Sequence, residues 1–334
     1  MKKKSSRTPD IKITAIGGGT GLSTMLRGLK HISPDLTAIV TVMDNGGGSG
    51  VLREELGMLP PGDIRNCLQA LANTEPTMEA LLSYRFTSGT LSGQSFGNLF
   101  LAALNGMCST FDEAVARMSE VLAITGRVLP VTNENVQLLA DFDDGASVKG
   151  ESEIAAYKKD GRRRITRVHL SPEHPAALGK CVDAIREADL LVLGPGSLYT
   201  SIIPNLLVSG ISEAIHESDA VKVYVMNLMT QGGETAGYTA VDHVRALFDH
   251  GGAGLFDWAL VNSLPIPPDV REEYRREGAV PIEADASALS ALGVSVRCAP
   301  VALRQGMLVR HDPAALAEAL RALYREASPT RIYG

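Results

Sequence analysis

Four short runs rich in Gly, Ser, Thr, Asn and Asp carry the residues of this sequence that could do chemistry. They lie at 17–21, 44–50, 194–200 and 227–235, each directly after a short apolar stretch. Glycines let backbone N–H groups approach phosphate oxygens, and a helix that follows such a run presents free N–H donors at its positive end. This combination is typical of loops that hold the phosphates of a nucleotide-type ligand.

The first run, at 17–21, departs from both common phosphate-binding fingerprints. When a G-x-G-x-x-G pattern is counted from Gly17, its last glycine falls on Leu22, and when it is counted from Gly19 that position is Thr24. No Gly-Lys-Ser/Thr sequence follows, so a Walker-type lysine is absent. The phosphate site is predicted instead from the place of the run, after a first strand and before a helix.

Acidic and basic side chains accompany the next motifs. Asp44 ends the second expected strand, where it could hold a ribose hydroxyl or simply begin a turn. Asp63 is expected to cap a helix, while Arg65 and Asn66 in its first turn could either reach an anion or be solvated.

The two later runs offer hydroxyl, aromatic and amide groups. Ser197 and Thr200 could donate to a phosphate and Tyr199 could stack on a base, with plain helix capping as the alternative. The run at 227–235 holds more polar groups than a turn needs. No Ser, Cys and His residues are arranged as a catalytic triad, which favours binding over nucleophilic catalysis.

These residues must be positioned by alternating strands and helices. Strands are expected at 11–16, 36–43, 190–193, 221–226 and 258–261. Helices are expected at 22–31, from 61, at 77–84, 95–104, 110–124 and 176–187, from 204, at 239–249 and from 313. Because crossovers between parallel strands are right-handed, we predict an α/β fold with a doubly wound, mostly parallel, Rossmann-like sheet. Ligands bind such sheets at the carboxyl ends of the strands, so the four runs should share one cleft.

A β-rich stretch at 128–170 interrupts this alternation and predicts a small antiparallel insertion. Its strands are expected at 136–142, 146–149 and 164–170, joined by hairpin turns at Asp143-Asp144-Gly145 and Asp160-Gly161. Lys158, Lys159 and the three arginines at 162–164 flank the second turn, and we expect them to form a solvated tip. The whole chain is expected to be a tail at 1–10, one α/β domain at 11–326 and a C-terminal tail at 327–334.

Composition narrows the class of protein. A net charge of −6 argues against a general nucleic-acid binder, which needs a basic surface. Four scattered cysteines form no metal or disulfide pattern and suit a reducing compartment. The lysines at 2–4 are not followed by an apolar segment, and no apolar stretch is long enough to span a bilayer. We therefore expect a cytoplasmic protein without membrane insertion.

Six motifs in the same order resemble the YvcK/CofD-like family over roughly residues 11 to 326. They are AIGGGTGL at 15–22, VTVMD with its glycine loop at 40–50, PPGDIRN at 60–66, SFGNL at 95–99, GPGSLYT at 194–200 and MTQGGETAGY at 229–238. One branch of this family transfers a phospholactate-type group from a guanosine diphosphate carrier to a deazaflavin precursor, with magnesium. The other comprises the gluconeogenesis factors, cytoplasmic bacterial proteins that bind UDP-sugars such as UDP-N-acetylglucosamine. They support cell-wall homeostasis and cell shape during growth on gluconeogenic carbon sources.

Three stretches, at 128–133, 194–200 and 230–238, look closer to the gluconeogenesis factors. The family's second loop usually carries two adjacent aspartates and then Gly-Gly-Ser-Ser-Gly, but here Asn45 replaces the second acid and Gly48 the first serine. Because magnesium sites need carboxylates, this departure favours binding without turnover. If the chain is nevertheless a magnesium-dependent 2-phospho-L-lactate transferase, Asp44 and Asp63 are the candidates for catalysis. A nicotinamide oxidoreductase is disfavoured by the broken fingerprint.

The resemblance implies one site for a nucleotide-diphosphate sugar, to which Tyr274 and Arg310 add contacts with the sugar and phosphates. A magnesium ion, a regulatory protein partner and a homodimer are left open. The residues expected at the site are Gly18, Gly19, Thr20, Gly21, Leu22, Asp44, Asn45, Gly47, Ser49, Asp63, Arg65, Asn66, Asn98, Asn133, Gly194, Pro195, Gly196, Ser197, Tyr199, Thr200, Asn227, Thr230, Glu234, Thr235, Tyr274 and Arg310.

Overall fold

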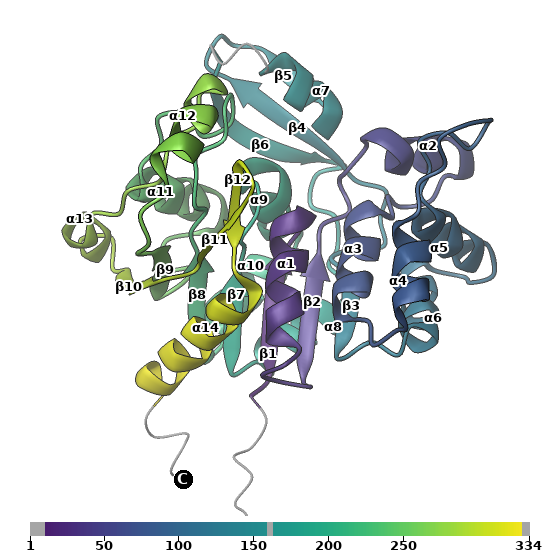
Figure 1. Cartoon of the computed structure of the whole chain (residues 1–334), viewed down its shortest axis with the longest axis horizontal. Helices are drawn as coiled ribbons and strands as arrows, with labels where there is room; N and C mark the ends of the chain where they lie inside the picture. The colour runs from purple at the N-terminus through teal and green to yellow at the C-terminus, as the bar shows by residue number, and fades with distance from the viewer. Residues whose placement is uncertain (1–10, 159–162, 329–334) are drawn as a thin grey trace, which may run out of the picture.

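The computed structural model describes residues 11–158 and 163–328, and its centre is a sheet with helices on both faces (Figure 1). The strands of this sheet are β1 (Ile13–Gly17), β2 (Leu36–Val40), β3 (Arg127–Pro130), β7 (Leu190–Leu193), β8 (Val221–Val225), β9 (Trp258–Asn262) and β10 (Ser295–Ala299). They lie in the order β10-β9-β8-β7-β1-β2-β3, and every neighbouring pair is parallel. After β1 the chain adds β2 and β3 toward one edge of the sheet, and after β7 it adds β8, β9 and β10 toward the other edge. The predicted doubly wound sheet is thus confirmed, with its switch point between β1 and β7.

Helices cover both faces of the sheet. In Figure 1, α1 (Gly19–Leu29) and α14 (Pro313–Ala327) lie in front and pack against each other, and α3 (Gly62–Leu71) packs beside α1. Behind the sheet lie α8 (Gly179–Arg186) and α10 (Ile211–Glu217). The others are α2 (Gly47–Leu56), α4 (Pro76–Ser83), α5 (Phe96–Gly106), α6 (Phe111–Val121), α7 (Glu151–Tyr157), α9 (Ile203–Leu206), α11 (Ala240–Gly251), α12 (Pro268–Arg276) and α13 (Ala286–Ser290). In the described part of the chain, every helix is too short or too polar to cross a lipid bilayer.

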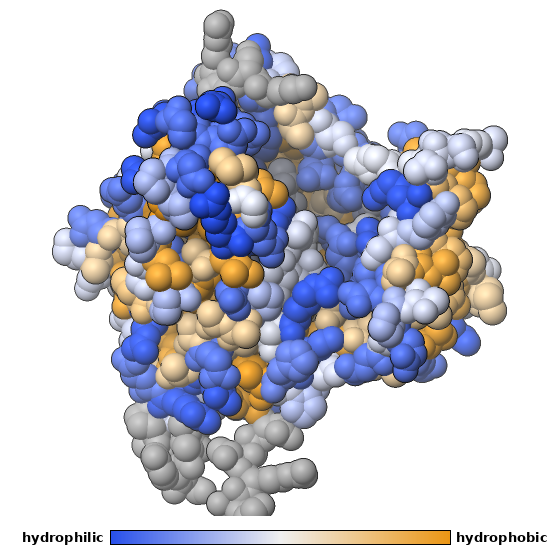
Figure 2. Space-filling view, viewed as in Figure 1, coloured by the Kyte–Doolittle hydropathy of each residue, from blue (hydrophilic) through white to orange (hydrophobic). Residues whose placement is uncertain are grey.

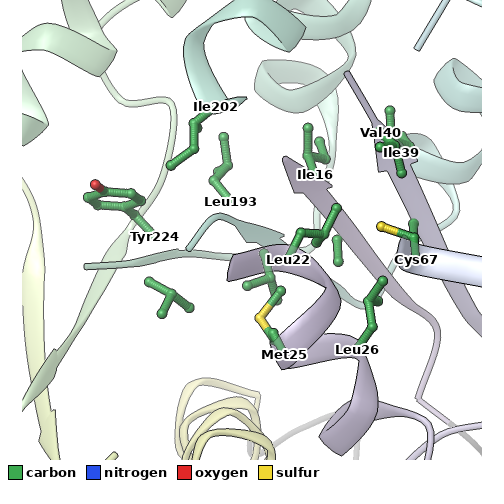
Figure 3. Packing of buried hydrophobic residues seen from close by; sticks show 14 of the residues in the cluster. Ile16, Leu22, Met25, Leu26, Ile39, Val40, Cys67, Leu193, Ile202 and Tyr224 are labelled. Atoms are coloured by element: carbon green, nitrogen blue, oxygen red, sulfur yellow. The ribbon is translucent and has the colours of Figure 1, made fainter. Parts of the chain in front are cut away.

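The core lies where α1 packs on the central strands (Figure 3). Every residue of β1 and β2 is buried because helices cover both faces, which explains why these strands read as continuous apolar runs. Leu22, Met25 and Leu26 follow the helical period and are fully buried against the sheet. The same packing fixes the position of the glycine run that joins β1 to α1.

Three boundaries near the first two glycine-rich runs differ from the sequence-based expectation. Helix α1 begins at Gly19 rather than at Leu22, so part of the glycine run forms its first turn. Strand β2 ends at Val40 rather than Met43, because its partner Gly17 is the last residue of β1 and no further pairing follows. Helix α2 starts at Gly47, inside the second glycine-rich run that was expected to be a loop.

The antiparallel insertion is confirmed as a small sheet in the order β5-β4-β6. Its strands are β4 (Gln137–Phe142), β5 (Ser147–Lys149) and β6 (Ile165–Ser171). The stretch 128–130 instead forms β3 of the main sheet, and helix α7 between β5 and β6 was not predicted. The first hairpin turn is present, whereas the turn expected at Asp160-Gly161 lies outside the described residues. A separate hairpin pairs β11 (Ala302–Gln305) with β12 (Leu308–His311).

Candidate functional site

Three glycines shape the turn between β1 and α1, each for a different reason. A Cβ at Gly21 would lie 2.4 Å from the carbonyl oxygen of Pro195, so the loop after β7 contacts this turn directly. A Cβ at Gly18 would lie 2.4 Å from Thr41 Cγ2. Gly19 has a φ of +65°, which strains any other residue. The turn therefore tolerates no larger side chains, and its backbone lies at the switch point of the sheet.

The first turn of α1 supplies backbone donors. The N–H of Gly19 donates to Asp63 Oδ2 at 2.6 Å. The N–H groups of Thr20 and Gly21 have no intrahelical partner, as is usual for the first residues of a helix. The Asp63 carboxylate occupies one donor of this positive helix end, and no acidic residue belongs to the turn itself, so the N–H groups of Thr20 and Gly21 are the donors left for an anion.

The loops after β7 and β8 are held together by side-chain amides. Asn227 accepts from the Gly196 N–H at 3.2 Å and donates to the Gly196 carbonyl at 2.7 Å. Gln231 Nε2 donates to Ser197 Oγ at 3.0 Å. The Thr230 hydroxyl oxygen accepts from the N–H of Val280 at 2.9 Å, which attaches the loop after β8 to the segment that follows α12. These bonds make the two loops one continuous wall.

A cavity of about 300 Å³ lies between this wall, the start of α1 and the β11–β12 hairpin. It is within the range of small-molecule sites, roughly 300–1,000 Å³. Its lining residues are Gly19, Thr20, Gly21, Thr24, Pro195, Gly196, Ser197, Ser201, Asn227, Leu228, Met229, Thr230, Gln231, Tyr274, Val309, Arg310 and His311. None of these described lining residues is acidic. Figure 2 shows the surface hollowed above the upper end of α1, below the insertion.

Arg310 is the cation of this cavity. Burial lowers the pKa of the neighbouring His311 to about 4, so His311 is neutral at pH 7. The Tyr274 hydroxyl holds β12 in place, because it accepts from the N–H of Val309 at 3.3 Å. Arg310 pairs with Leu303 through the β11–β12 ladder, but its side chain makes no hydrogen bond or ion pair with any other described residue. Its guanidinium is therefore available for a charge-assisted bond to an anion.

Carboxylates gather on the other side of the glycine turn. Burial raises the pKa of Asp63 to about 6, the Gly19 N–H opposes this shift, and the charge of Asp44 adds to it. Burial also raises the pKa of Glu151 to about 8, helped by the charge of Asp44 and by a hydrogen bond to it. Asp63 does not cap its own helix as predicted, because α3 starts after Pro61 and the carboxylate is turned toward α1.

The side chain of Asn45 is bonded to helix α7. Its Oδ1 accepts from the N–H of Ser152 at 2.8 Å and its Nδ2 donates to Glu153 Oε2 at 2.8 Å, so it attaches α7 to the second loop. Over residues 11–158 and 163–328, no three acidic, histidine or cysteine side chains form a group that could hold a metal. The protein donors near Asp44 and Asp63 do not make a complete magnesium site, and we assign no metal to them.

The structure brings only part of the predicted site together. Along the cavity lie Gly19, Thr20, Gly21, Pro195, Gly196, Ser197, Asn227, Thr230, Tyr274 and Arg310. Outside its lining are Gly18, Leu22, Asp44, Asn45, Gly47, Ser49, Asp63, Arg65, Asn66, Asn98, Asn133, Gly194, Tyr199, Thr200, Glu234 and Thr235. Sequence reasoning missed Thr24, Ser201, Gln231 and His311. Of these, Thr24 could have been found, since it follows Thr20 by one helical turn.

Several predicted ligand contacts are structural in this fold. Leu22 is fully buried in the core. Tyr199 is also buried and its hydroxyl lies 2.8 Å from that of Tyr238, so it is not available to stack on a base. Asn133 donates to Asp112 Oδ1 of α6 at 2.9 Å and lies away from the cavity.

Glu234 is a support of the loop that contains it. Its Oε1 accepts from the N–H of Tyr199 at 2.8 Å, and its Oε2 pairs with Lys158 Nζ at 3.3 Å. Both side chains of this ion pair are buried. The expectation that Lys158 belongs to a solvated tip is therefore wrong, while Lys159 and Arg162 lie outside the described residues.

Comparison with known proteins supports this reading of the fold. The family model described as 2-phospho-L-lactate transferase CofD matches residues 13–302. The gluconeogenesis factor of Bacillus subtilis is 49% identical over 94% of this chain and 98% of that protein. The gluconeogenesis factor of Halalkalibacterium halodurans is 47% identical over 96% of each. The crystal structure of protein BH3568 from Bacillus halodurans has a TM-score of 0.90 at 47% identity, over 93% of this chain and 99% of that one. As the six motifs predicted, the chain belongs to the CofD family, in the branch whose relatives are named gluconeogenesis factors.

Proposed function

We propose that this protein binds a nucleotide-diphosphate sugar, such as UDP-N-acetylglucosamine. The ligand would lie in the cavity between α1, the loops after β7 and β8, and β12. The observation that carries the proposal is the acid-free lining, in which the start of α1 and the guanidinium of Arg310 are the positive groups. A helix N-terminus and an arginine together suit a diphosphate. The place of the cavity, at the switch point between β1 and β7, suits a nucleotide.

Within this proposal the protein holds its ligand rather than transforming it. The cavity lining contains no acidic side chain, and its one histidine is buried and hydrogen-bonded to the Met226 carbonyl at 3.2 Å. Neither a general base nor a nucleophile with a base beside it is therefore present among the described lining residues. We propose accordingly a cytoplasmic regulatory protein that supports cell-wall homeostasis and cell shape during growth on gluconeogenic carbon sources.

Calorimetric titration with UDP-N-acetylglucosamine and UDP-glucose tests the binding proposal. We expect Arg310→Gln to weaken binding by about tenfold or more, since a hydrogen bond to a charged group contributes about 1.5–3 kcal/mol. The matched control is Arg304→Gln on the same hairpin, because Arg304 pairs with Asp269 and does not line the cavity. Its affinity should equal that of the wild type. Absence of binding to both sugars at millimolar ligand would contradict the proposal.

The second candidate is a transferase that uses a nucleotide-diphosphate-linked phospholactate, and the description of the matching family model favours it. Asp44 and Asp63 are its candidate acids, and they lie outside the cavity lining. The protein incubated with magnesium, such a donor and a deazaflavin acceptor would then give a new product by mass spectrometry. We expect no product, because Asn45 stands where magnesium would need a second carboxylate, and its amide is bound to α7 instead.

A further inference from the structure

Arg65 is a cation outside the cavity that has no acidic partner. It lies in the first turns of α3, where its Nε donates to Asn98 Oδ1 at 3.2 Å and its Nη1 to Gln69 Oε1 at 3.4 Å. Both acceptors are neutral amides, and no ion pair joins Arg65 to any acid in the described ranges. The nearby Asp63 directs its Oδ2 to the Gly19 N–H instead.

A second guanidinium increases the positive charge at this place. Arg85 lies beside Ser95 through an isolated β-bridge, and its Nη1 donates to the carbonyl of Gly93. Burial lowers the pKa of Arg65, and the charge of Arg85 lowers it further. Within the described residues Arg85 also forms no ion pair. The charge of Asp63 opposes this lowering but is the last of its causes, and no described carboxylate is ion-paired with either guanidinium. Two neighbouring guanidiniums without an ion-paired carboxylate are energetically costly, and a bound anion would compensate both.

The N-terminus of α5 adds donors to the same place. A Cβ at Gly97 would lie 2.9 Å from Arg65 Cδ, so the first turn of this helix lies directly against the arginine. Asn98 is 3% exposed, and its oxygen accepts from Arg65, whereas its NH₂ group has no hydrogen-bond partner among the described residues. No acidic residue occupies this turn of α5, which leaves the positive end of its dipole uncompensated.

We propose that Arg65, Arg85 and Asn98 form a second oxyanion subsite, separate from the cavity at α1, that takes a carboxylate or a phosphate group. Planar guanidiniums bind both groups in a two-pronged geometry, and the amide of Asn98 supplies a further donor. Asp63 connects the two places, because it contacts Gly19 at the cavity and precedes Arg65 by two residues. The oxyanion is either an acidic substituent on the sugar of the nucleotide sugar or a separate small anion. The first source rests on the proposed function and the second does not.

Calorimetry with two matched ligands and one free anion separates these sources. UDP-glucuronate and UDP-glucose differ by a single carboxylate, so their ratio of dissociation constants isolates the second subsite. With the sugar as the source, UDP-glucuronate binds about tenfold more tightly to the wild type, and Arg65→Gln brings the ratio near one. With a separate anion as the source, the ratio is near one in both proteins. Inorganic phosphate then binds to wild-type protein saturated with UDP-glucose and not to Arg65→Gln.

Two further variants keep the test interpretable. Arg85→Gln changes an exposed side chain, so it should fold normally and still reduce the same ratio or the same phosphate binding. Arg117→Gln, an exposed arginine on α6, is the control and should change neither. A ratio near one in the wild type together with phosphate binding that is absent or independent of Arg65 would overturn the subsite. If UDP-glucose does not bind, the proposed function fails, and phosphate titration of the free protein still tests the subsite.

Discussion

Asp63 lies between the first turn of α1 and the charged residues Asp44 and Arg65. It accepts a hydrogen bond from the first residue of α1. Burial nevertheless dominates and raises its pKa to about 6, which means that the folded protein holds the ionised carboxylate at a cost.

The pH dependence of stability follows from the direction of this shift. A carboxyl whose pKa is higher in the folded than in the unfolded state contributes stability below its unfolded pKa, and this contribution is lost as the pH rises through about 6. Asp63→Asn removes the charge and keeps an oxygen for the Gly19 N–H. We expect it to raise the free energy of unfolding by up to about 3 kcal/mol at pH 8, and by progressively less toward pH 5.

Urea denaturation from pH 5 to pH 8 checks this prediction, with the exposed Asp35→Asn as the control. A gain in stability that is equal at both ends of the range would show that the charge of Asp63 is not its cause.

Some residues that line the cavity could be predicted where the signal is local. The glycine run indicated a phosphate loop from its place after a strand, and the family resemblance added Tyr274 and Arg310, which both line the cavity. Tyr199 was misread as a free aromatic ring because burial against Tyr238 depends on a contact 39 residues away. Long-range pairs of this kind leave no pattern in a local stretch of sequence.

At the scale of elements, the insertion is attached to the cleft by polar contacts at both ends of α7. Asn45 accepts from Ser152 at its start, and Lys158 at its end reaches Glu234 in the loop after β8. A Cβ at Gly233 would lie 2.5 Å from the carbonyl oxygen of Lys158, so the two backbones also touch. The insertion therefore supports the loop that forms one wall of the cavity.

Lys158→Met tests the contribution of this attachment. It leaves the buried carboxylate of Glu234 without its cation, which should reduce the free energy of unfolding by about 3–5 kcal/mol. The double variant Lys158→Met with Glu234→Gln should recover most of the loss, because a glutamine still accepts from the N–H of Tyr199. Denaturant titration of both variants measures this difference. Equal destabilisation of the single and double variants would contradict the account.

Some helices and strands could be predicted from the sequence, and others could not. Continuous apolar runs and helical periods identified the central strands and α1, since these elements are buried on a regular period. Helix α7 was missed because its seven residues, ESEIAAY, bury only Ile154 and depend on contacts with other elements. The start of α2 was missed because its glycines have low helix propensity, and the fold overrides that preference.

At the scale of the whole molecule, strand order brings the glycine turn and the loops after β7 and β8 together. The last pair between β1 and β7 joins Ile16 to Leu193, which lie far apart in the sequence. No local signal indicates this pairing, so only the rules for parallel sheets predicted it. Those rules placed the cleft at the carboxyl ends of the strands, as found for the cavity. The arrangement of the β11–β12 hairpin over this edge was not predicted, because no rule of sheet topology positions it.

A crystal structure of the protein with UDP-N-acetylglucosamine would show directly whether the cavity at the start of α1 holds the ligand. We expect the diphosphate at the start of α1, with its oxygens within hydrogen-bond distance, about 3 Å, of the Thr20 and Gly21 N–H groups and the Arg310 guanidinium. A nucleotide sugar bound elsewhere, with the cavity at the start of α1 left without its diphosphate, would contradict this expectation.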